Sequence, residues 1–500
     1  MSCRLFILLL LCNWQLVAKT YYVSEDGLLI NKGTEESPLP FDYFERSRNH
    51  AGDIFIVMDG VYPNHWITRI YGEKNRPVII KSENWLGADL VGIKEKRDNT
   101  RKILQIKGDY SWFVDFEIYE KEASNRIRNN GEEFYFSDGV HLYGKGGKVI
   151  NCVAHDVLIG FSTWSAALEG EIYGCLAYNI GWNDLESSRK NKGHGHGYYV
   201  QNKAGQSTYK KLALNIVWGT GSEGFHSYTQ KGNIEYFHFE NNLAYNLIGF
   251  NQSRSIGRGF ILGGYQPVTG LKLINNHLYK VSLQVGYGAN YPIISKNVSI
   301  TQNYLIESKI NLYYLEDMKY FADNFIVSSD LLLTAIQDRE KSDNTWDWPF
   351  KDNKIHLVDR SGSLRIGIQE LTVKGTRYVP LDESKWKNNF NEVTTKVPAS
   401  KAFLYQNKYN PDRALVYVYN FKSLDNFPVE MGKFLEKGEK FEVRDIENIH
   451  KIIYQGVYEG QPVHLPMNLT ELAELSGNLP KEHAKHSDKR FNAFLIKKVN

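Results

Sequence analysis

Two histidines, two tyrosines and three glycines share ten consecutive positions of this 500-residue chain. The segment 193–202 has the sequence GHGHGYYVQN. An imidazole can accept or donate a proton near neutral pH, and alternating glycines let the backbone approach a ligand closely. His194, His196 and Tyr199 are therefore candidate acid–base groups of a catalytic site.

This segment is one member of a repeat. Short stretches that begin with glycine and then alternate start at Gly139, Gly160, Gly197, Gly224 and Gly259, at intervals of 21 to 37 residues. Each is followed 12 to 18 residues later by a second stretch that carries an asparagine or a glycine. A repeat of strands and turns without a helical pattern predicts one coil of a parallel β-solenoid, in which equivalent residues stack about 4.8 Å apart.

The asparagines of the second stretch predict a structural ladder. An asparagine carries a donor and an acceptor and tolerates the left-handed backbone of a repeated turn. The series comprises Asn151, Gly174, Asn215, Asn242, Asn276, Asn303 and Asn324. Cys152 and Cys175 each follow the Asn/Gly position, as do Ile216 and Leu243, so we expect the cysteines to point inward, either as a disulfide or as two buried thiols.

Alternation in the glycine-initiated strands separates an inner from an outer face. The first and third residues after each glycine are mostly apolar and should face the core. The second and fourth should face outward, and they gather histidines and aromatic rings where a solvated face would carry lysine, glutamate and serine. We expect a ligand groove lined by His141, Tyr143, Trp164, Tyr199, Gln201, His226 and Tyr228.

Charged residues flank this expected groove. The residue before the glycine is polar on several coils, as Asp138, His196, Glu223 and Arg258. Two long intervals, 160–197 and 224–259, place extra loops beside the same face, and such loops often carry the function of a solenoid. Their candidate substrate-binding cations are Arg189, Lys192, Arg254 and Arg258.

The remaining sequence predicts three further regions. Residues 1–18 have the proportions of a cleaved signal peptide, with Arg4 before a short apolar run, so we expect a secreted or periplasmic protein. The solenoid should span 19–340, with a polar linker over 341–360. Short alternating segments in 361–500 predict a small antiparallel β-sandwich. A net charge of +3 gives no support for nucleic-acid binding. The sequence contains no second apolar run of spanning length, so we expect no membrane insertion.

Several of these stretches resemble a known group of proteins. The opening coils carry Gly52-Asp53, then Asp59-Gly60-Val61-Tyr62, then Pro77-Val78-Ile79-Ile80. Together with HG-x-Y-x-QN at 196–202 and G-x-H-x-Y at 224–228, they resemble secreted bacterial right-handed parallel β-helix carbohydrate-active proteins, including the chondroitinase B and alginate lyase family. The resemblance implies an all-β fold and a glycan context. The "NKS" and "RHG" motifs of chondroitinase B-like lyases have no match in the expected coils.

Three functions fit these residues. A polysaccharide lyase needs a cation for the substrate carboxylate, a base and an acid, and the catalytic candidates are His196, Tyr199, His226, Glu223 and His194. A glycoside hydrolase needs two carboxyl groups about 5 to 9.5 Å apart. Asp138 and Glu223 should be about 14 Å apart, whereas Glu223 with Asp184 or Glu186 of the first long interval remains possible. A non-catalytic glycan-binding scaffold or an epimerase stays open. We favour the lyase.

His194, His196, His141, His226 and Glu223 could alternatively form a metal site, but their spacing fits no standard zinc motif, so we predict no metal ligands. Participation of Ca²⁺ is left open. The expected partner is a polysaccharide or oligosaccharide, bound by a monomer.

Overall fold

The structure is a computed structural model of the whole chain. It describes residues 18–93, 102–121, 127–128, 136–184, 192–227, 233–247, 257–286, 295–313, 315–328, 333–336, 350–357, 366–372, 375–380, 392–477 and 485–499. The expected signal peptide therefore lies outside the described residues, apart from Ala18, and remains a prediction. None of the described segments is a helix long and apolar enough to cross a membrane.

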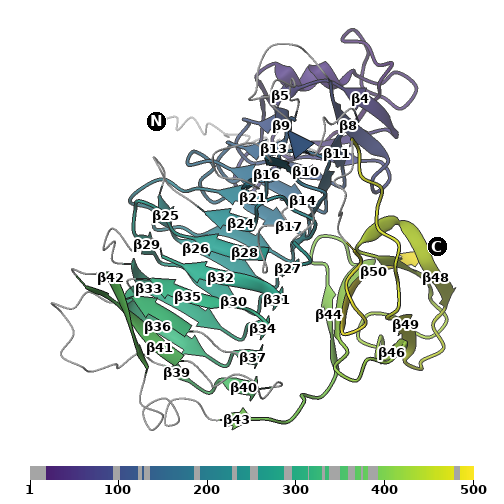
Figure 1. The fold of residues 1–500 in the computed structure, drawn as a ribbon. Helices are drawn as coiled ribbons and strands as arrows, with labels where there is room; N and C mark the ends of the chain where they lie inside the picture. The colour runs from purple at the N-terminus through teal and green to yellow at the C-terminus, as the bar shows by residue number, and fades with distance from the viewer. Residues whose placement is uncertain are drawn as a thin grey trace, which may run out of the picture.

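Three long, mainly parallel sheets wind along most of the chain and form the predicted parallel β-helix (Figure 1). Sheet 1 contains β1 (Thr20–Val23), β3 (Ile54–Val57), β7 (Val78–Ser82), β10 (Ser111–Val114), β14 (Lys148–Ile150), β17 (Glu171–Tyr173), β22 (Lys210–Ala213), β25 (Ile234–Glu235), β26 (Phe237–Glu240), β29 (Val268–Thr269), β30 (Lys272–Ile274), β33 (Ser295–Thr301), β36 (Leu315–Ala322) and β39 (Phe350–Lys351). Sheet 2 contains β4 (Gly60–Pro63), β8 (Ala88–Gly92), β11 (Glu117–Glu120), β15 (Val153–His155), β18 (Leu176–Tyr178), β23 (Ile216–Val217), β27 (Leu243–Tyr245), β31 (His277–Tyr279), β34 (Tyr304–Ile306), β37 (Phe325–Ser328), β40 (Lys354–Leu357) and β43 (Glu392–Thr394).

Sheet 3 holds the glycine-initiated strands. It contains β5 (Trp66–Thr68), β9 (Lys102–Ile106), β13 (Asp138–Leu142), β16 (Ile159–Thr163), β21 (His196–Val200), β24 (Glu223–Ser227), β28 (Gly257–Leu262), β32 (Val281–Val285), β35 (Ile310–Tyr313), β38 (Leu333–Ile336), β41 (Ile366–Thr372) and the antiparallel β42 (Gly375–Pro380). The short elements beside the sheets are one 3₁₀ helix, η1 (Phe41–Glu45), and the strands β2 (Arg48–Asn49), β6 (Ile70–Tyr71), β12 (Ile127–Arg128), β19 (Trp182–Asp184) and β20 (Lys192–His194).

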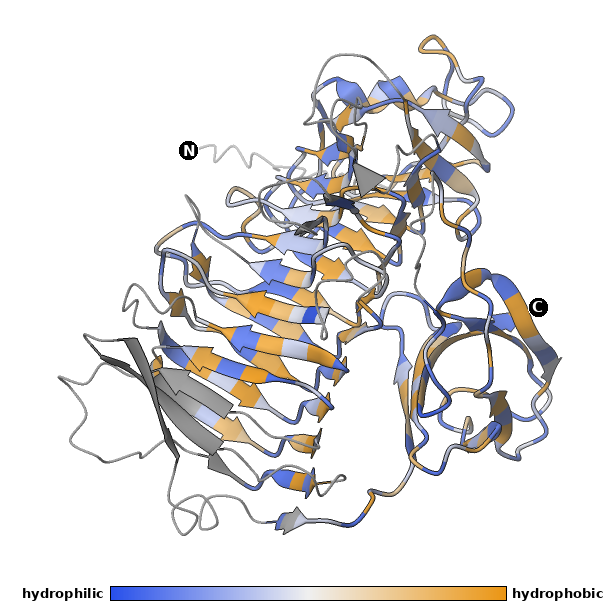
Figure 2. Ribbon diagram, viewed as in Figure 1, coloured by the Kyte–Doolittle hydropathy of each residue, from blue (hydrophilic) through white to orange (hydrophobic). Residues whose placement is uncertain are grey.

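The core follows the predicted alternation, and orange and blue residues alternate along many strands in Figure 2. Phe161, Tyr198, Phe225 and Phe260 are in register on consecutive strands of sheet 3, and each is fully buried. Their rings stack with centroid distances of 5.4, 4.5 and 4.5 Å. The inward prediction for the first residue after the glycine is confirmed on these coils.

The asparagine ladder is present, with one shift of register. Side-chain bonds run from Asn215 through Asn242, Asn276, Asn303 and Asn324 to Asn353. Because Leu176 pairs with Ile216, the ladder position of the earlier coils is occupied by Cys152 and Cys175 rather than by Asn151 and Gly174. Asn151 and Gly174 instead take the preceding left-handed position, with φ of 56° and 65°. The cysteines are buried free thiols.

The parallel ladders continue past residue 340, where the sequence predicts that the solenoid ends. Strands β40 and β43 extend sheet 2 to Thr394, so the described strands within the expected linker and at the start of the expected sandwich pair with the solenoid. The polar composition of 341–360 concealed these coils.

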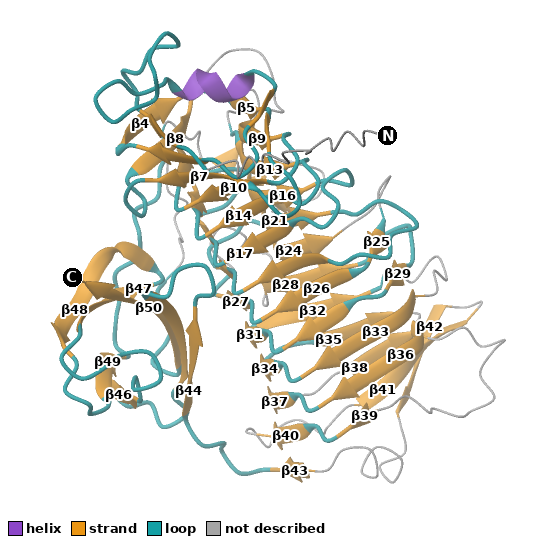
Figure 3. Ribbon diagram, turned by 180° about the vertical axis from the view of Figure 1, so that it is seen from behind, coloured by secondary structure: helices purple, strands orange, loops and turns teal. Residues whose placement is uncertain are grey.

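The C-terminal domain is an antiparallel β-structure that begins at β44. It contains β44 (Lys401–Gln406), β45 (Arg413–Tyr419), β46 (Asn426–Val429), β47 (Lys440–Asp445), β48 (Asn448–Val457), β49 (Val463–Pro466) and β50 (Phe491–Val499). It lies beside sheet 2, as Figure 3 shows from behind. One buried cluster joins Leu176, Trp218 and Tyr245 of the solenoid to Tyr417 and Phe491 of this domain. The predicted groove on sheet 3 therefore lies on a different face from the domain contact.

Candidate functional site

Glycines at the start of the sheet 3 strands let adjacent coils approach closely. A Cβ added to Gly160, Gly197 or Gly224 would lie 2.7, 3.0 or 2.8 Å from the carbonyl oxygen of the glycine on the next coil. Such contacts are too short for any side chain there. The strand pairing skips this glycine, so the residue before it and the second residue after it both face outward. On β21 these are His196 and Tyr199, whereas Tyr198 points into the core.

Two rows of outward side chains result from this register. In the first row, His196 pairs with Glu223, and Glu223 pairs with Arg258. In the second row, Tyr199 pairs with His226. The structure thus brings together five of the predicted site residues on β21, β24 and β28.

The central cluster is held by ion pairs and ring contacts. His196 Nδ1 lies 2.9 Å from Glu223 Oε2, and the Arg258 guanidinium donates to Glu223 Oε1 at 2.9 Å. The Nδ1 atoms of His196 and His226 are 3.3 Å apart. The Tyr199 ring stacks on His196 at 5.2 Å and meets His226 at 5.3 Å between centroids. Glu223 is buried, whereas the Arg258 side chain is 45% exposed.

The environment separates the protonation states of these groups. Burial, together with the His196 and Arg258 charges, lowers the pKa of His226 to about 3 despite the nearby Glu223, so this imidazole is neutral at neutral pH. Burial raises the pKa of Tyr199, which keeps its phenol protonated. Burial alone would raise the pKa of Glu223, but the hydrogen bond to His196 and the charge of His196 hold it well below its usual value. The cluster therefore offers a neutral base, a phenolic acid and a guanidinium cation in one place.

Aromatic rings continue the face toward the N-terminal coils. Tyr143 and Trp164 stack at 6.4 Å with an interplanar angle of 11°, and Trp164 meets Tyr199 edge-on at 6.0 Å. Partly exposed flat rings of this kind can support the apolar faces of sugars.

His141 lies on the predicted face but is not exposed. Only 1% of its side chain is accessible, because Trp164 of the next coil covers it and donates from Nε1 to His141 Nδ1 at 2.7 Å. Its Nε2 lies 3.0 Å from Asp138 Oδ2, and burial lowers its pKa. His141 is thus placed to orient Trp164, and direct ligand contact, as predicted from the sequence, would require Trp164 to move.

Lys210 of sheet 1 also reaches this region, which the repeat pattern did not indicate. Its fully buried ammonium group donates to the carbonyl oxygens of Trp164 and Gln201 at 2.7 and 2.6 Å, and burial lowers its pKa to about 7. Gln201 in turn donates to the Tyr199 hydroxyl at 3.4 Å. Lys210 therefore ties together the ends of β16 and β21 beneath the candidate site. Lys210 and Lys211 follow a polar stretch, and such a pair is typical of a solvated turn, which is why the pattern did not reveal the buried Lys210.

The other predicted site residues divide into two groups. His194 is on β20, and its ring stacks on Trp182 of β19 at 4.2 Å, outside the central cluster of contacts described above. Lys192 lies at the start of the same strand. Arg189, Tyr228 and Arg254 lie outside the described residues, so their roles remain predictions.

Two groups of described side chains could hold a metal ion, which the sequence did not predict. One is His196, Glu223 and His226, and the other is Glu117, His155 and His450. In each group the ligand atoms lie within 4.8 Å of one another. In the first group Arg258 already places a cation on Glu223, which disfavours a second cation there.

Comparison with known proteins gives structural likeness only. No protein-family model matches the chain, and no curated protein matches it in sequence. One similar solved structure is a rhamnogalacturonan lyase, with 16% identity and a TM-score of 0.43, where the match covers 76% of this chain and 88% of that one. Another is pectate lyase Pel9A, with 15% identity and a TM-score of 0.37, where the match covers 66% of this chain and 80% of that one. An alginate lyase from a Paenibacillus species has 13% identity and a TM-score of 0.38, and the match covers 70% of this chain and 99% of that one. A lacto-N-biosidase from Eubacterium ramulus has 14% identity and a TM-score of 0.39, and the match covers 68% of each chain. Likeness at this level does not extend to the residues of a site.

Proposed function

We propose that this chain is an exported carbohydrate-active enzyme that cleaves an acidic polysaccharide by β-elimination at the outward face of sheet 3. One observation carries the proposal: a neutral imidazole, a protonated phenol and a guanidinium lie together on β21, β24 and β28. Elimination from a uronic acid requires a base, an acid and a cation, which these three groups supply.

The roles follow from the protonation states. Arg258 neutralises the uronate carboxylate, which makes the adjacent carbon-bound proton more acidic. His226 accepts that proton, the bond to the glycosidic oxygen breaks, and Tyr199 donates its proton to the departing oxygen. The electron pair of the broken C–H bond becomes the new carbon–carbon double bond. Glu223 is a positioning residue, because it holds both His196 and Arg258 by ion pairs.

Hydrolysis by two carboxyl groups is the second candidate function. It would need a partner about 5 to 9.5 Å from Glu223. Asp138 is three strands away, about 14 Å at the spacing of parallel strands. Glu186 and the side chain of Asp184 lie outside the described part of the chain, so this candidate depends on residues that the structure does not describe. The described carboxylates favour elimination.

The two reactions are separable by their products. We expect the purified protein to raise the ultraviolet absorbance of a uronate-containing polysaccharide, because elimination leaves an unsaturated uronate. Reducing ends that appear without this absorbance would instead support a hydrolase. A panel of uronate polymers that yields neither product would contradict the proposal.

Variants test the assignment of residues. H226N and Y199F should each lower kcat by about 10²- to 10⁴-fold, the usual contribution of an acid or base. Matched controls are H464N on β49 and Y454F on β48, because both side chains are exposed on the C-terminal domain. Circular dichroism checks folding. Full activity in both site variants would remove these residues from the mechanism.

A further inference from the structure

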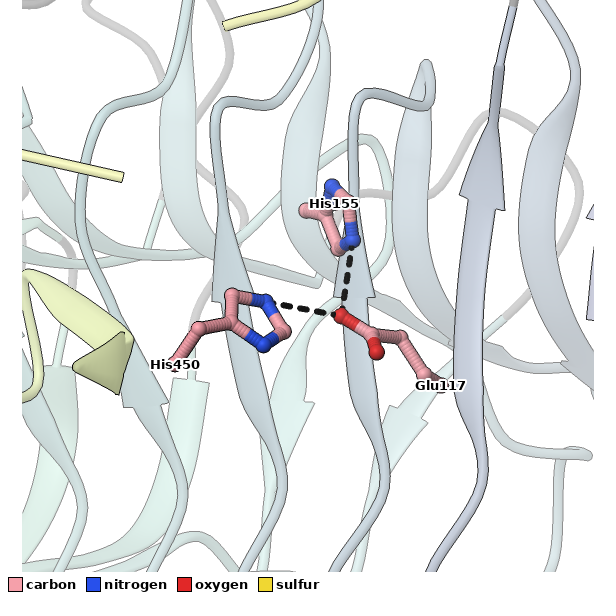
Figure 4. A group of neighbouring side chains, drawn as sticks. All are labelled: Glu117, His155 and His450. Atoms are coloured by element: carbon pink, nitrogen blue, oxygen red, sulfur yellow. Dashed lines mark hydrogen bonds and ion pairs between the residues drawn. The ribbon is translucent and has the colours of Figure 1, made fainter. Parts of the chain in front are cut away.

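A second cluster of ligand-type side chains lies where the C-terminal domain meets sheet 2. Glu117 and His155 come from neighbouring strands, β11 and β15, and His450 comes from β48 (Figure 4). The Nε2 atoms of both histidines lie 3.0 Å from the same carboxylate oxygen, Glu117 Oε1. We propose that Glu117, His155 and His450 bind a divalent transition-metal ion, with zinc as the best fit, and that this ion fastens the C-terminal domain to the solenoid.

The geometry of the three ligand atoms is close to that of a zinc site. Zinc is bound by histidine nitrogen and carboxylate oxygen at about 2.0 to 2.2 Å, usually in a tetrahedron, which separates neighbouring ligands by about 3.3 to 3.5 Å. The two measured nitrogen–oxygen distances are 3.0 Å. An outward shift of a few tenths of an ångström would therefore admit the ion. The His450 side chain is 50% exposed, which leaves a path for its entry.

His155 is held in the orientation that a metal ligand needs. Its ring lies between Tyr119 and Tyr178, stacked at 4.9 and 4.8 Å with angles of 13° and 9°. Its Nδ1 is 2.6 Å from Asp156 Oδ2, so Nε2 faces Glu117. Asp156 is buried and accepts a bond from the Ser476 amide at 3.0 Å. A carboxylate behind the second ring nitrogen is the usual arrangement around metal-bound histidines.

The local charge also favours a cation. Glu117, Asp156 and Asp89 place three carboxyl groups beside the two imidazoles, and Asp89 interacts with the Tyr119 hydroxyl at 3.2 Å. No arginine is ion-paired with Glu117 among the described residues, in contrast to Glu223 with its Arg258.

Metal binding can be measured on the full-length protein without any substrate. After treatment with EDTA and dialysis, the protein is titrated with Zn²⁺ by calorimetry, and with Co²⁺ by visible absorbance. We expect one equivalent to bind, with affinity at least 10-fold weaker in E117Q and in H450N. The control H464N should bind as the unaltered protein does, because its histidine is exposed on β49 of the same domain.

A further variant separates this site from the sheet 3 cluster. H226N should keep zinc binding, because His226 is not part of the proposed site. Loss of binding in H226N with retention in H450N would overturn the assignment, as would the absence of stoichiometric binding to the unaltered protein. The measurement is independent of the lyase assay, so either proposal can fail alone.

The fastening role has its own readout. Zinc should raise the thermal unfolding temperature of the unaltered protein and of H464N, and should leave that of H450N unchanged. An equal rise in all three proteins would indicate binding elsewhere and would contradict the proposed clamp. Because His450 is half exposed, H450N should fold, and circular dichroism in EDTA verifies this.

Discussion

Arg258 is held by one carboxylate and keeps part of its guanidinium exposed. One of its nitrogens donates to Glu223 Oε1 at 2.9 Å, while its side chain remains 45% exposed. A guanidinium carries five donors, so the bond to Glu223 fixes its position and leaves further donors for a ligand carboxylate. The ion pair therefore orients the cation at the site.

Replacement of Arg258 should affect acidic substrates selectively. We expect R258M to lower kcat/KM on a uronate polymer on the order of 10- to 100-fold, the value of a hydrogen bond to a charged group. R258K should lose less, because it keeps the charge but not the paired donors. Steady-state kinetics at two salt concentrations check this, and R258M should show the weaker salt dependence. An unchanged kcat/KM in R258M would exclude Arg258 as the cation.

At the scale of the elements, the repeat itself allowed much of the site to be predicted. Alternation after each glycine placed Tyr199 and His226 on one outer face, and the residues before the glycines formed the row of His196, Glu223 and Arg258. The strand period carries this information because stacking is local.

Other features depend on contacts between elements that are distant along the chain, and these could not be predicted from the sequence. His141 is buried because Trp164 on the next coil covers it. Lys210 belongs to sheet 1, and its side chain extends to the end of β16 in sheet 3. The position of Cys152 and Cys175 was shifted by one in the prediction because the left-handed residue before each of them is itself Asn151 or Gly174, which looks like a member of the ladder. The extension of the solenoid to Thr394 was hidden by polar coils.

Gly224 of β24 lies where adjacent coils approach too closely for a side chain. A Cβ in G224A would lie 2.8 Å from the Gly259 oxygen and 3.0 Å from Val217 Cγ1, so β24 must move away from β28. We expect a loss of about 1 to 3 kcal/mol in the free energy of unfolding, as for overpacked cores, and lower activity because His226 and Arg258 move apart. Urea unfolding measures the first effect.

The control is G432A in the C-terminal domain, where the added Cβ would meet only the Tyr458 hydroxyl at 3.3 Å. Equal stability of G224A and G432A would show that the coils tolerate the side chain, contrary to the close approach described here.

At the scale of the whole molecule, the C-terminal domain is seated on sheet 2 by buried polar contacts as well as by apolar packing. His277 of β31 is fully buried at this interface. Its Nδ1 and Nε2 lie 2.9 and 2.7 Å from the hydroxyls of Tyr419 and Tyr405. Its ring stacks on Tyr304 at 5.2 Å. Burial, with a smaller effect of the Lys401 charge, lowers the pKa of His277 to about 3. The interface therefore requires a neutral imidazole.

Acid should weaken this interface through His277. An unfolded histidine has a pKa of about 6.5, so between pH 6.5 and about 3 the unfolded state holds a proton that the folded state lacks. The contribution of His277 is fully present above pH 6.5 and is lost as pH falls, by at most about 1.4 kcal/mol per pH unit. H277Q should be less stable at pH 7 but should lose less stability between pH 6.5 and 4. Urea unfolding in EDTA at several pH values measures both slopes, with H464N as the exposed-histidine control. Parallel curves for H277Q and the unaltered protein would show that this imidazole does not couple acidity to the seating of the domain.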